Sequence, residues 1–214
     1  MHKKILFTFI LINTLFAQTF SIARVQYGGG GDWYSDPSSL PNLLIFLNKN
    51  TPLSVNIKET RIKLTDDNAK QYPYLYLTGH GNINFSDNEV IALRSILLNG
   101  GFLHADDNYG MDQAFRREIK KVFPNKDLIP LPNNHIIFNS YYNFPNGLPK
   151  VHEHDNKPAQ AFGLYEKNKM ILLYTYESDL GDGWEDESVH QDSWEIREAS
   201  LKMGVNIIYF ILTQ

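Results

Sequence analysis

The segment His104-Ala105-Asp106-Asp107 places a histidine and two carboxylates directly after a short apolar stretch. An aspartate held on a strand-to-helix turn can act as a general base, a nucleophile or a metal ligand, with a nearby histidine assisting it. The structural alternative is that one aspartate caps the following helix and the histidine is a hydrogen-bonded core residue. We predict that His104, Asp106 and Asp107 include at least one catalytic group.

His152 and His154 have the His-x-His spacing that directs both imidazoles to the same side of an extended chain. Together with a carboxylate, such a pair suits zinc or another divalent cation. Two histidines at this spacing are also common on surfaces that bind no metal. His135 and His190 have no companion in the sequence that distinguishes them. The predicted metal ligands are therefore His152 and His154, and a divalent metal is the candidate cofactor.

Eight acidic residues and no lysine or arginine lie from Glu177 to Glu195. Glu177 and Asp179 come at the end of an apolar strand, where a buried carboxylate pair could share a proton and serve as acid and base. With Asp182 and Asp186, they could instead bind a hard cation such as calcium or magnesium. The remaining acidic residues are typical of a solvated loop and of a helix N-terminus. We predict Glu177 and Asp179 as catalytic residues.

Four consecutive glycines, at positions 28–31, could bring bare backbone N–H groups up to an anion or a sugar. The run lacks the third glycine of a dinucleotide fingerprint, and no Gly-Lys-Ser/Thr follows it as in an ATP-binding loop. The alternative is a turn that requires positive φ angles, which glycine adopts without steric cost. The predicted ligand-binding residues are Gly29, Gly30, Asp32, Trp33 and His80.

Apolar patterns predict the elements that must position these residues. Strands are expected at 20–27, 54–58, 74–78 and 102–104, and residues 161–165 and 170–176 are expected to form a hairpin. Helices are expected at 38–50, from the capping box at Ser86 to Gly100, from Met111 to Pro124, and after a cap at Asp192. Residues 124–160 hold six of the ten prolines and are predicted to be irregular.

This alternation predicts an α/β fold: a single doubly wound, largely parallel sheet with helices on both faces. In such sheets ligands bind beyond the carboxyl ends of the strands. Four polar segments follow expected strands, at 28–33, 78–81, 104–108 and 177–186. We therefore expect these segments to gather at one rim of the sheet.

The N-terminal segment is typical of a secretory signal peptide. Lys3 and Lys4 precede an apolar run from Ile5 to Phe16, which is short for a membrane span. The alternative is a membrane anchor that is not cleaved. We predict a leader at residues 1–19 and one domain at residues 20–214. The protein is then exported, periplasmic or secreted, with no transmembrane segment after cleavage.

Composition excludes several classes of function. The 214 residues include 20 basic and 24 acidic side chains, and the net charge of −4 argues against nucleic acid as the main partner. The absence of cysteine excludes disulfides, thiolate nucleophiles and cysteine-ligated metals. With 43% hydrophobic and 21% charged residues, the chain has the balance of a packed globule rather than of a disordered segment.

Long stretches of the chain are similar to a known bacterial family. The segments are RVQYGGGGDWYSDP, LYLTGHGNINFSDNE, LLNGGFLHADDNYGMDQAFRREI, LPKVHEHD and YESDLGDGWEDE. They resemble the family catalogued as domain of unknown function 4159, from about Phe20 to Phe210. The resemblance implies a class I glutamine amidotransferase-like fold, but it implies no reaction. The turn where amidotransferases carry their nucleophilic cysteine corresponds to Ala105-Asp106-Asp107, so thiol-dependent glutamine hydrolysis is not available.

Two functions from different classes remain open at this point. The first is a hydrolase-like enzyme that acts on a polar envelope or glycan substrate, with Asp106 or Asp107 as base or nucleophile and Glu177 as its partner. The second is a non-catalytic module that binds a ligand or an envelope partner with the same groups. In either case the expected partner is a small molecule or a glycan.

Overall fold

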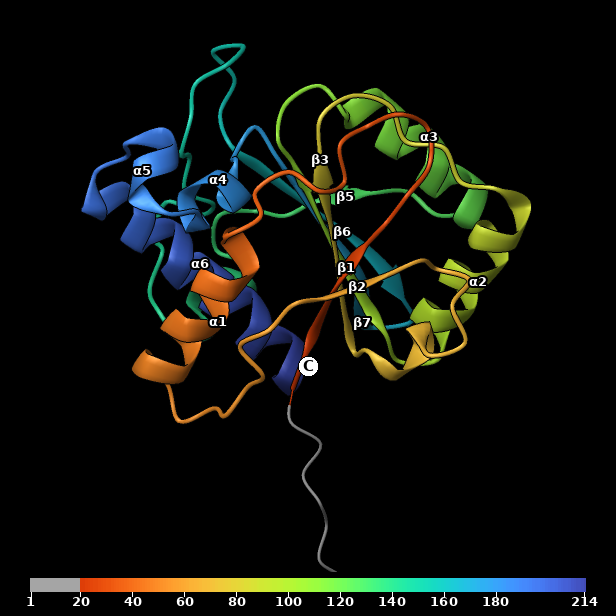
Figure 1. The fold of residues 1–214 in the computed structure, drawn as a ribbon, viewed down its shortest axis with the longest axis horizontal. Helices are drawn as coiled ribbons and strands as arrows, with labels where there is room; N and C mark the ends of the chain where they lie inside the picture. Colours follow the sequence, from red (N-terminus) through yellow and green to blue (C-terminus); the bar gives the residue numbers. More distant parts are fainter. Residues whose placement is uncertain (1–19) are drawn as a thin grey trace, which may run out of the picture.

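The computed structural model describes residues 20–214, which form one layer of strands between two layers of helices (Figure 1). The predicted leader at residues 1–19 lies outside the described residues. The sheet has seven strands in the order β2-β1-β3-β4-β7-β6-β5. The strands are β1 Ile22–Val25, β2 Thr60–Ile62, β3 Tyr74–Gly79, β4 Phe102–Asp107, β5 Ile129–Pro130, β6 Gln160–Glu166 and β7 Lys169–Tyr176.

The sheet is mixed, so the predicted fold class is wrong for this chain. Strands β2, β1, β3, β4 and β7 are parallel to one another. Strand β6 is antiparallel to β7, and β5 is antiparallel to β6. The physical reason is the two-residue connection at Lys167-Asn168, because a turn this short can join only antiparallel strands. The largely parallel, doubly wound sheet of the class I glutamine amidotransferase-like type is therefore not what the chain forms.

Helices cover both faces of the sheet, as predicted (Figure 1). Helices α2 and α3 pack on one face, and α1, α4, α5 and α6 lie on the other side. The helices are α1 Ser39–Asn50, α2 Asp87–Leu98, α3 Asp112–Val122, α4 Leu180–Trp184, α5 Glu187–His190 and α6 Trp194–Thr213, with short 3-10 turns at Ala69–Gln71 and Ile136–Asn139. The central strands β3 and β4 are buried along their whole length, because helices cover them on both sides.

Two element predictions were wrong in position. The second strand is Thr60–Ile62 rather than 54–58, and Val55 makes only an isolated bridge to Phe20. The last helix is capped by Ser193, whose Oγ accepts a hydrogen bond from the backbone N–H of Ile196, and not by Asp192. The capping box at Ser86 is confirmed, since Ser86 and Glu89 each bind the other's backbone N–H.

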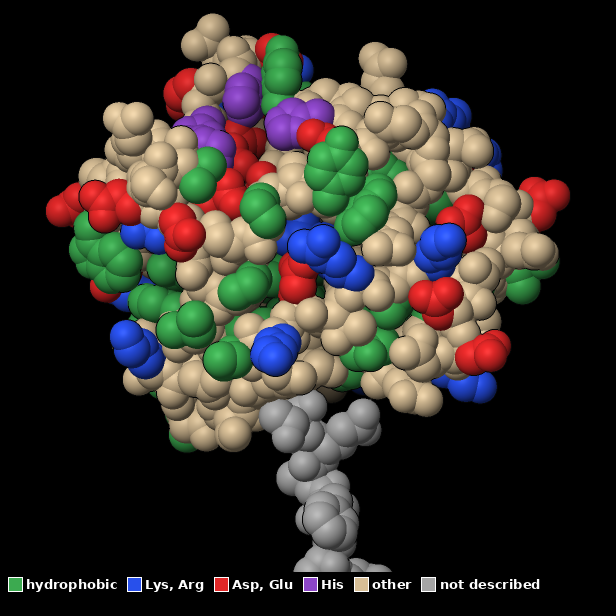
Figure 2. Space-filling view, in the orientation of Figure 1, with side chains coloured by type: hydrophobic (Ala, Val, Ile, Leu, Met, Phe, Trp, Pro, Cys, Tyr) green, Lys and Arg blue, Asp and Glu red, His purple; other side chains and the backbone are tan. Residues whose placement is uncertain are grey.

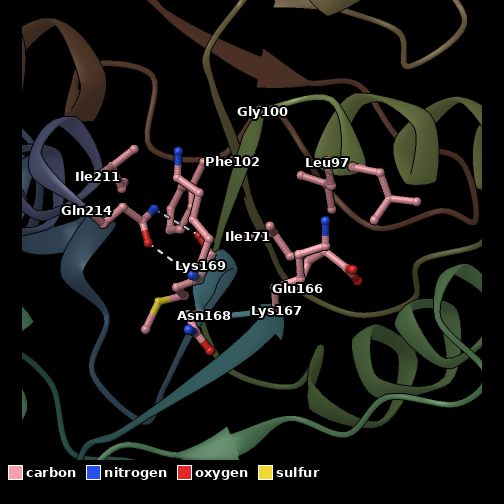
Figure 3. Close-up of a pocket in the computed structure, with 13 residues that line it drawn as sticks. Leu97, Gly100, Phe102, Glu166, Lys167, Asn168, Lys169, Ile171, Ile211 and Gln214 are labelled. Carbon is pink, nitrogen blue, oxygen red and sulfur yellow. Dashed lines mark hydrogen bonds between the residues drawn. The ribbon is translucent and has the colours of Figure 1, made fainter.

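A cavity of about 680 Å³ lies at the end of the sheet where β4 begins (Figure 3). Its walls include Leu97, Phe102 and Ile171, and Gln214 closes one side by pairing with the backbone of Met170. None of the histidines predicted for the site lines it. Within residues 20–214 no helix is both long and apolar enough to cross a membrane.

Candidate functional site

Histidine side chains surround a group of acidic side chains at one end of the molecule (Figure 2). This end is the rim where β4 and β7 finish and where the chain enters α4 and α5. The carboxyl ends of neighbouring parallel strands meet at such a rim, so the position agrees with the general rule for ligand sites in α/β sheets.

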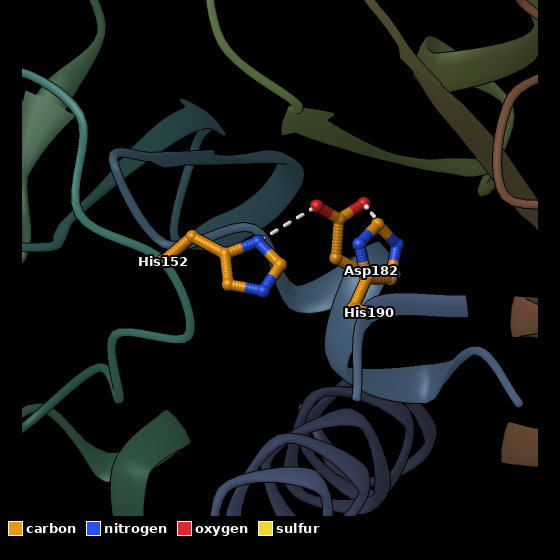
Figure 4. Close-up of side chains that lie close together, drawn as sticks. All are labelled: His152, Asp182 and His190. Carbon is orange, nitrogen blue, oxygen red and sulfur yellow. Dashed lines mark hydrogen bonds and ion pairs between the residues drawn. The ribbon is translucent and has the colours of Figure 1, made fainter. Parts of the chain in front are cut away.

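Three side chains offer ligand atoms for a metal ion. Nitrogens of His152 and His190 and a carboxylate oxygen of Asp182 all lie within 4.8 Å of one another. His152 Nδ1 is 2.9 Å from Asp182 Oδ2, and His190 Nε2 is 3.6 Å from Asp182 Oδ1 (Figure 4). Imidazole nitrogen and carboxylate oxygen are the donors that zinc and related ions prefer when cysteine is absent.

The passage from β7 into α4 is built from unusual backbone angles. Glu177 and Asp179 both adopt left-handed conformations, with φ of 57° and 55°. Gly181 follows, and its backbone N–H donates to Asp106 Oδ2 at 2.7 Å. A Cβ atom on Gly181 would lie 2.7 Å from both Asp36 Oδ2 and Tyr76 Oη, so only glycine fits between these groups. A non-glycine residue in the left-handed backbone region, such as Glu177 or Asp179, costs about 1–3 kcal/mol, and such residues are concentrated at functional sites.

Asp179 is a buried carboxylate at the centre of the rim. Its Oδ2 lies 2.5 Å from His154 Nε2 and 3.7 Å from His152 Nδ1. Its Oδ1 is buried and has no hydrogen-bond partner within the described part of the chain. Burial, together with the charges of Asp106 and Asp182, raises the pKa of Asp179 to about 8. A bound proton or a neighbouring cation would therefore stabilise the buried side chain of Asp179.

Asp36 adds a further carboxylate that the sequence analysis missed. Asn108 Nδ2 donates to Asp36 Oδ2 at 2.5 Å and to Asp182 Oδ1 at 3.1 Å, so one amide links the two acids. Burial, and then the charge of Asp182, raises the pKa of Asp36 to about 8. Asp36 itself has a φ of 54°, and its position after the glycine-rich run was the only signal of its role.

Arg24 fixes the loop that carries Asp36. This arginine is completely buried in β1, and its guanidinium donates to the backbone oxygens of Ser35 and Asp36 at 2.7 and 3.0 Å. It also donates to Glu59 Oε2 at 2.9 Å and to Ser39 Oγ at 3.1 Å. An arginine within an otherwise apolar strand is the sequence signal that could have revealed this role.

His104 lies in the core rather than at the rim. Its side chain is completely buried, and its two ring nitrogens lie 2.9 Å from Tyr74 Oη and 3.0 Å from Thr175 Oγ1. This arrangement matches the structural alternative of a hydrogen-bonded core histidine. Burial lowers the pKa of His104 to about 3.

The depressed pKa of His104 predicts a pH-dependent contribution to stability. An unfolded histidine takes up a proton near pH 6.5, whereas the folded protein resists protonation of His104 down to about pH 3. His104 therefore stabilises the fold fully above pH 6.5, and this contribution is lost as the pH falls toward 3. The difference in unfolding free energy between wild type and His104→Gln should shrink by about 1.4 kcal/mol per pH unit between pH 6.5 and 4.5. Urea unfolding at several pH values measures it, and a constant difference would contradict the prediction.

Asp106 and Asp107 both have structural partners. Asp106 is fully buried and accepts hydrogen bonds from Gly181 N, Tyr76 Oη and Thr175 Oγ1, so it anchors the start of α4. Burial raises the pKa of Asp106 to about 7. Asp107 Oδ1 accepts from the backbone N–H of Met111 at 3.1 Å, which holds the turn before α3. These contacts make Asp106 a positioning residue for α4, whereas Asp107 fixes the turn that leads into α3.

The glycine-rich loop lies at the other side of the rim, where it pairs with the loop after β3. Gly31 N donates to Asn82 O and Asn84 N donates to Gly28 O, at 2.9 and 2.8 Å. A Cβ on Gly29 would lie 2.6 Å from Asn84 N, which explains the requirement for glycine there. The N–H of Gly31 is thus bonded to protein, and the carbonyl oxygens of Gly28 and Gly29 are bonded to Asn84 and Asn82.

The other predicted ligand-binding residues occupy the same loops. His80 binds Asp32 through both its backbone N–H and its ring Nδ1, while Gly30 adopts a φ of 92° without close neighbours. Trp33 packs against the core, with the guanidinium of Arg61 over its ring at 5.9 Å. His80 and the glycines at 28–30 are exposed and Asp32 is partly exposed, so this loop is accessible to a ligand.

The structure brings His152 and His154 to Asp179 at this rim, although the segments expected there did not include these two histidines. Asp182, already a candidate cation ligand, lies with His152, and Asp36 and His190 are additions. Glu177 lies beside them, nearly buried, with its Oε2 3.4 Å from Lys150 Nζ. His190 follows Asp182 by eight residues across two short helices, a spacing that no sequence periodicity marks.

Comparison with known proteins gives a family for the chain. No curated protein matches it. The family described as "Domain of unknown function (DUF4159)" matches residues 21–212, which is almost the whole of the described chain. The chain therefore belongs to the DUF4159 family.

Proposed function

We propose that this protein is an exported, divalent-metal-dependent enzyme of the hydrolase type, acting on a polar envelope or glycan substrate. The observation that carries the proposal is the group of ligand atoms on His152, Asp182 and His190 next to a buried carboxylate. This carboxylate belongs to Asp179, whose Oδ2 lies 3.7 Å from His152 Nδ1 and whose Oδ1 has no hydrogen-bond partner within residues 20–214. A buried carboxylate oxygen without a donor costs about 1–3 kcal/mol, and a bound cation would remove that cost.

The surroundings of His152 support a role as a metal ligand. Its Nε2 lies 3.1 Å from Asp192 Oδ2, so this carboxylate can hold the ring and leave Nδ1 facing Asp182. Carboxylates that orient ligating histidines in this way are common around protein metal sites. The hydrogen bond to Asp182 raises the pKa of His152 to about 9. The surrounding carboxylates thus favour a positive charge at this position.

A divalent ion at this position would lower the pKa of a bound water and supply a nucleophile near neutral pH. Asp36 and Asp179 are the neighbouring carboxyls able to hold or release a proton during such a reaction. Asp106 and Gly181 would keep α4, and with it Asp182, in place. Export is supported by the sequence of the predicted leader.

Metal analysis of the untagged protein, expressed from Gln18 onward, tests the proposal. We expect about one equivalent of zinc or a similar ion after dialysis, and we expect His152→Ala and His190→Ala each to lose it. His135→Gln is the matched control, because His135 lies outside the rim and caps the 3-10 turn at residues 136–139. A metal-free wild type that remains metal-free after incubation with zinc, manganese and magnesium would overturn the proposal.

One observation favours the non-catalytic alternative. His104, Asp106 and Asp107, the three residues expected to react, all have structural partners in the fold. A module that binds its ligand through a metal would need only the rim histidines and Asp182. Metal binding without turnover of any envelope glycan would support this second function.

A further inference from the structure

A second cavity lies beside the metal-ligand cluster, on the other side of His154. It measures about 370 Å³ and lies between the start of α3, the end of β7 and the loop at residues 155–157. Its walls include Tyr109, Asp112, Asp155, Lys157, Tyr176 and Glu177. This volume is within the range of cavities that bind small ligands.

Tyr109 connects this cavity to the rim. Its ring stacks on the imidazole of His154, with the centroids 4.4 Å apart and the planes at 25°. His154 in turn contacts Asp179, the buried carboxylate next to His152. A molecule seated against Tyr109 is therefore connected to the metal-ligand cluster through the side chains of Tyr109, His154 and Asp179.

Glu177 presents a carboxylate oxygen to the cavity. The residue is 3% exposed, and Lys150 Nζ approaches only its Oε2, at 3.4 Å. Within residues 20–214 no hydrogen bond reaches Oε1 of Glu177. A nearly buried carboxylate oxygen that lines a cavity is satisfied when a ligand donates a hydrogen bond to it.

The charges at the cavity select against anions. Lys157 is bonded to Asp155 and to Tyr176 Oη, and Lys150 is shared between Glu153 and Glu177. Asp112 is paired with Arg116. Each lysine near the cavity is thus already bonded to a carboxylate, and a phosphate or carboxylate ligand would meet Glu177 without a free cation.

We propose that this cavity binds one ring of an uncharged sugar. A sugar ring has an apolar C–H face that packs on an exposed tyrosine and hydroxyls that donate to a carboxylate, the two features that Tyr109 and Glu177 present. The inference rests on the proposed function in that it names the substrate class. The sugar would then extend past His154 toward the metal-ligand cluster.

Calorimetric titration with three tetrasaccharides tests the proposal in the presence of a chelator, so that sugar binding is measured independently of any metal. We expect saturable binding of cellotetraose and of tetra-N-acetylchitotetraose, and much weaker binding of tetragalacturonate. Tyr109→Ala should weaken binding about tenfold, and Glu177→Gln should weaken it while preserving the shape of the cavity.

Tyr141→Ala is the matched control, because Tyr141 is 41% exposed and Tyr109 is 45% exposed, but Tyr141 does not line the cavity. It should leave the affinity unchanged, and melting curves of all variants identify loss of folding. Three results would each overturn the inference: no binding of either neutral sugar at millimolar concentration, equal binding of tetragalacturonate, or equal affinities of the Tyr109→Ala and Tyr141→Ala variants. Sugar binding by a wild type that takes up no metal in the metal analysis would overturn only the proposed metal chemistry.

Discussion

Replacing Arg24 by leucine is expected to lower the free energy of unfolding by about 3–5 kcal/mol. The guanidinium is completely buried and bonded to Glu59 and to the backbone oxygens of Ser35 and Asp36. Leucine fills part of the volume but removes the arginine donor of Glu59 Oε2 and of the Ser35 carbonyl oxygen, whereas Asp36 O keeps its hydrogen bonds from Ser39. Urea unfolding at pH 7, followed by circular dichroism, measures the loss.

Arg61→Leu is a closely matched control for this prediction. Arg61 binds the other carboxylate oxygen of Glu59, at 2.7 Å, but its side chain is exposed. Exposed ion pairs contribute up to about 1 kcal/mol, so the control should lose far less stability than Arg24→Leu. Equal losses in the two variants would show that burial of Arg24 does not matter and would contradict the account of how Asp36 is held.

Replacing Asp179 by asparagine is expected to shift stability in opposite directions with and without metal. In chelator the variant should be more stable than wild type by about 1–3 kcal/mol, because a neutral amide avoids the cost of burying or protonating this carboxylate, whose pKa is raised by burial to about 8. Asparagine also tolerates the left-handed conformation of this residue, with its φ of 55°. Thermal unfolding in chelator measures the gain.

The second half of this prediction concerns zinc. A ligand present at one hundred times its dissociation constant stabilises a folded protein by about 2.7 kcal/mol, and we expect Asp179→Asn to lose most of that increment. Asp186→Asn, in which an exposed acid at the start of α5 is changed, should behave like wild type in both conditions. An Asp179→Asn protein that is destabilised in chelator would show that the carboxylate is satisfied in the metal-free fold.

Local patterns were sufficient for most elements of this fold. The capping box at Ser86 and the apolar runs of β3, β4 and β7 predict their elements closely, since caps and buried strands depend on neighbouring residues. The error in fold class arose at the hairpin of β6 and β7. Its antiparallel pairing was predicted, but the sheet as a whole was still expected to be largely parallel. The short edge strand β5 has only two residues and no pattern that could reveal it.

The site was harder to predict, because its residues meet through tertiary contacts. His152 and Asp182 come from an irregular segment and a five-residue helix, and their contact depends on a path that no periodicity specifies. Residue type alone could not separate His104, which belongs to the core, from His190, which belongs to the rim. What distinguishes them is burial, and burial follows from the complete sheet rather than from neighbouring residues.

The position of β7 in the sheet also affects folding while the chain is being synthesised. β4 pairs with β3 and with β7, and the partner of Asp106 is Thr175, 69 positions further along the chain. Until β7 has been synthesised, one side of this apolar central strand remains an open edge that other unfinished chains could join. Fragments that stop after α3 would leave this edge open and should aggregate rather than fold.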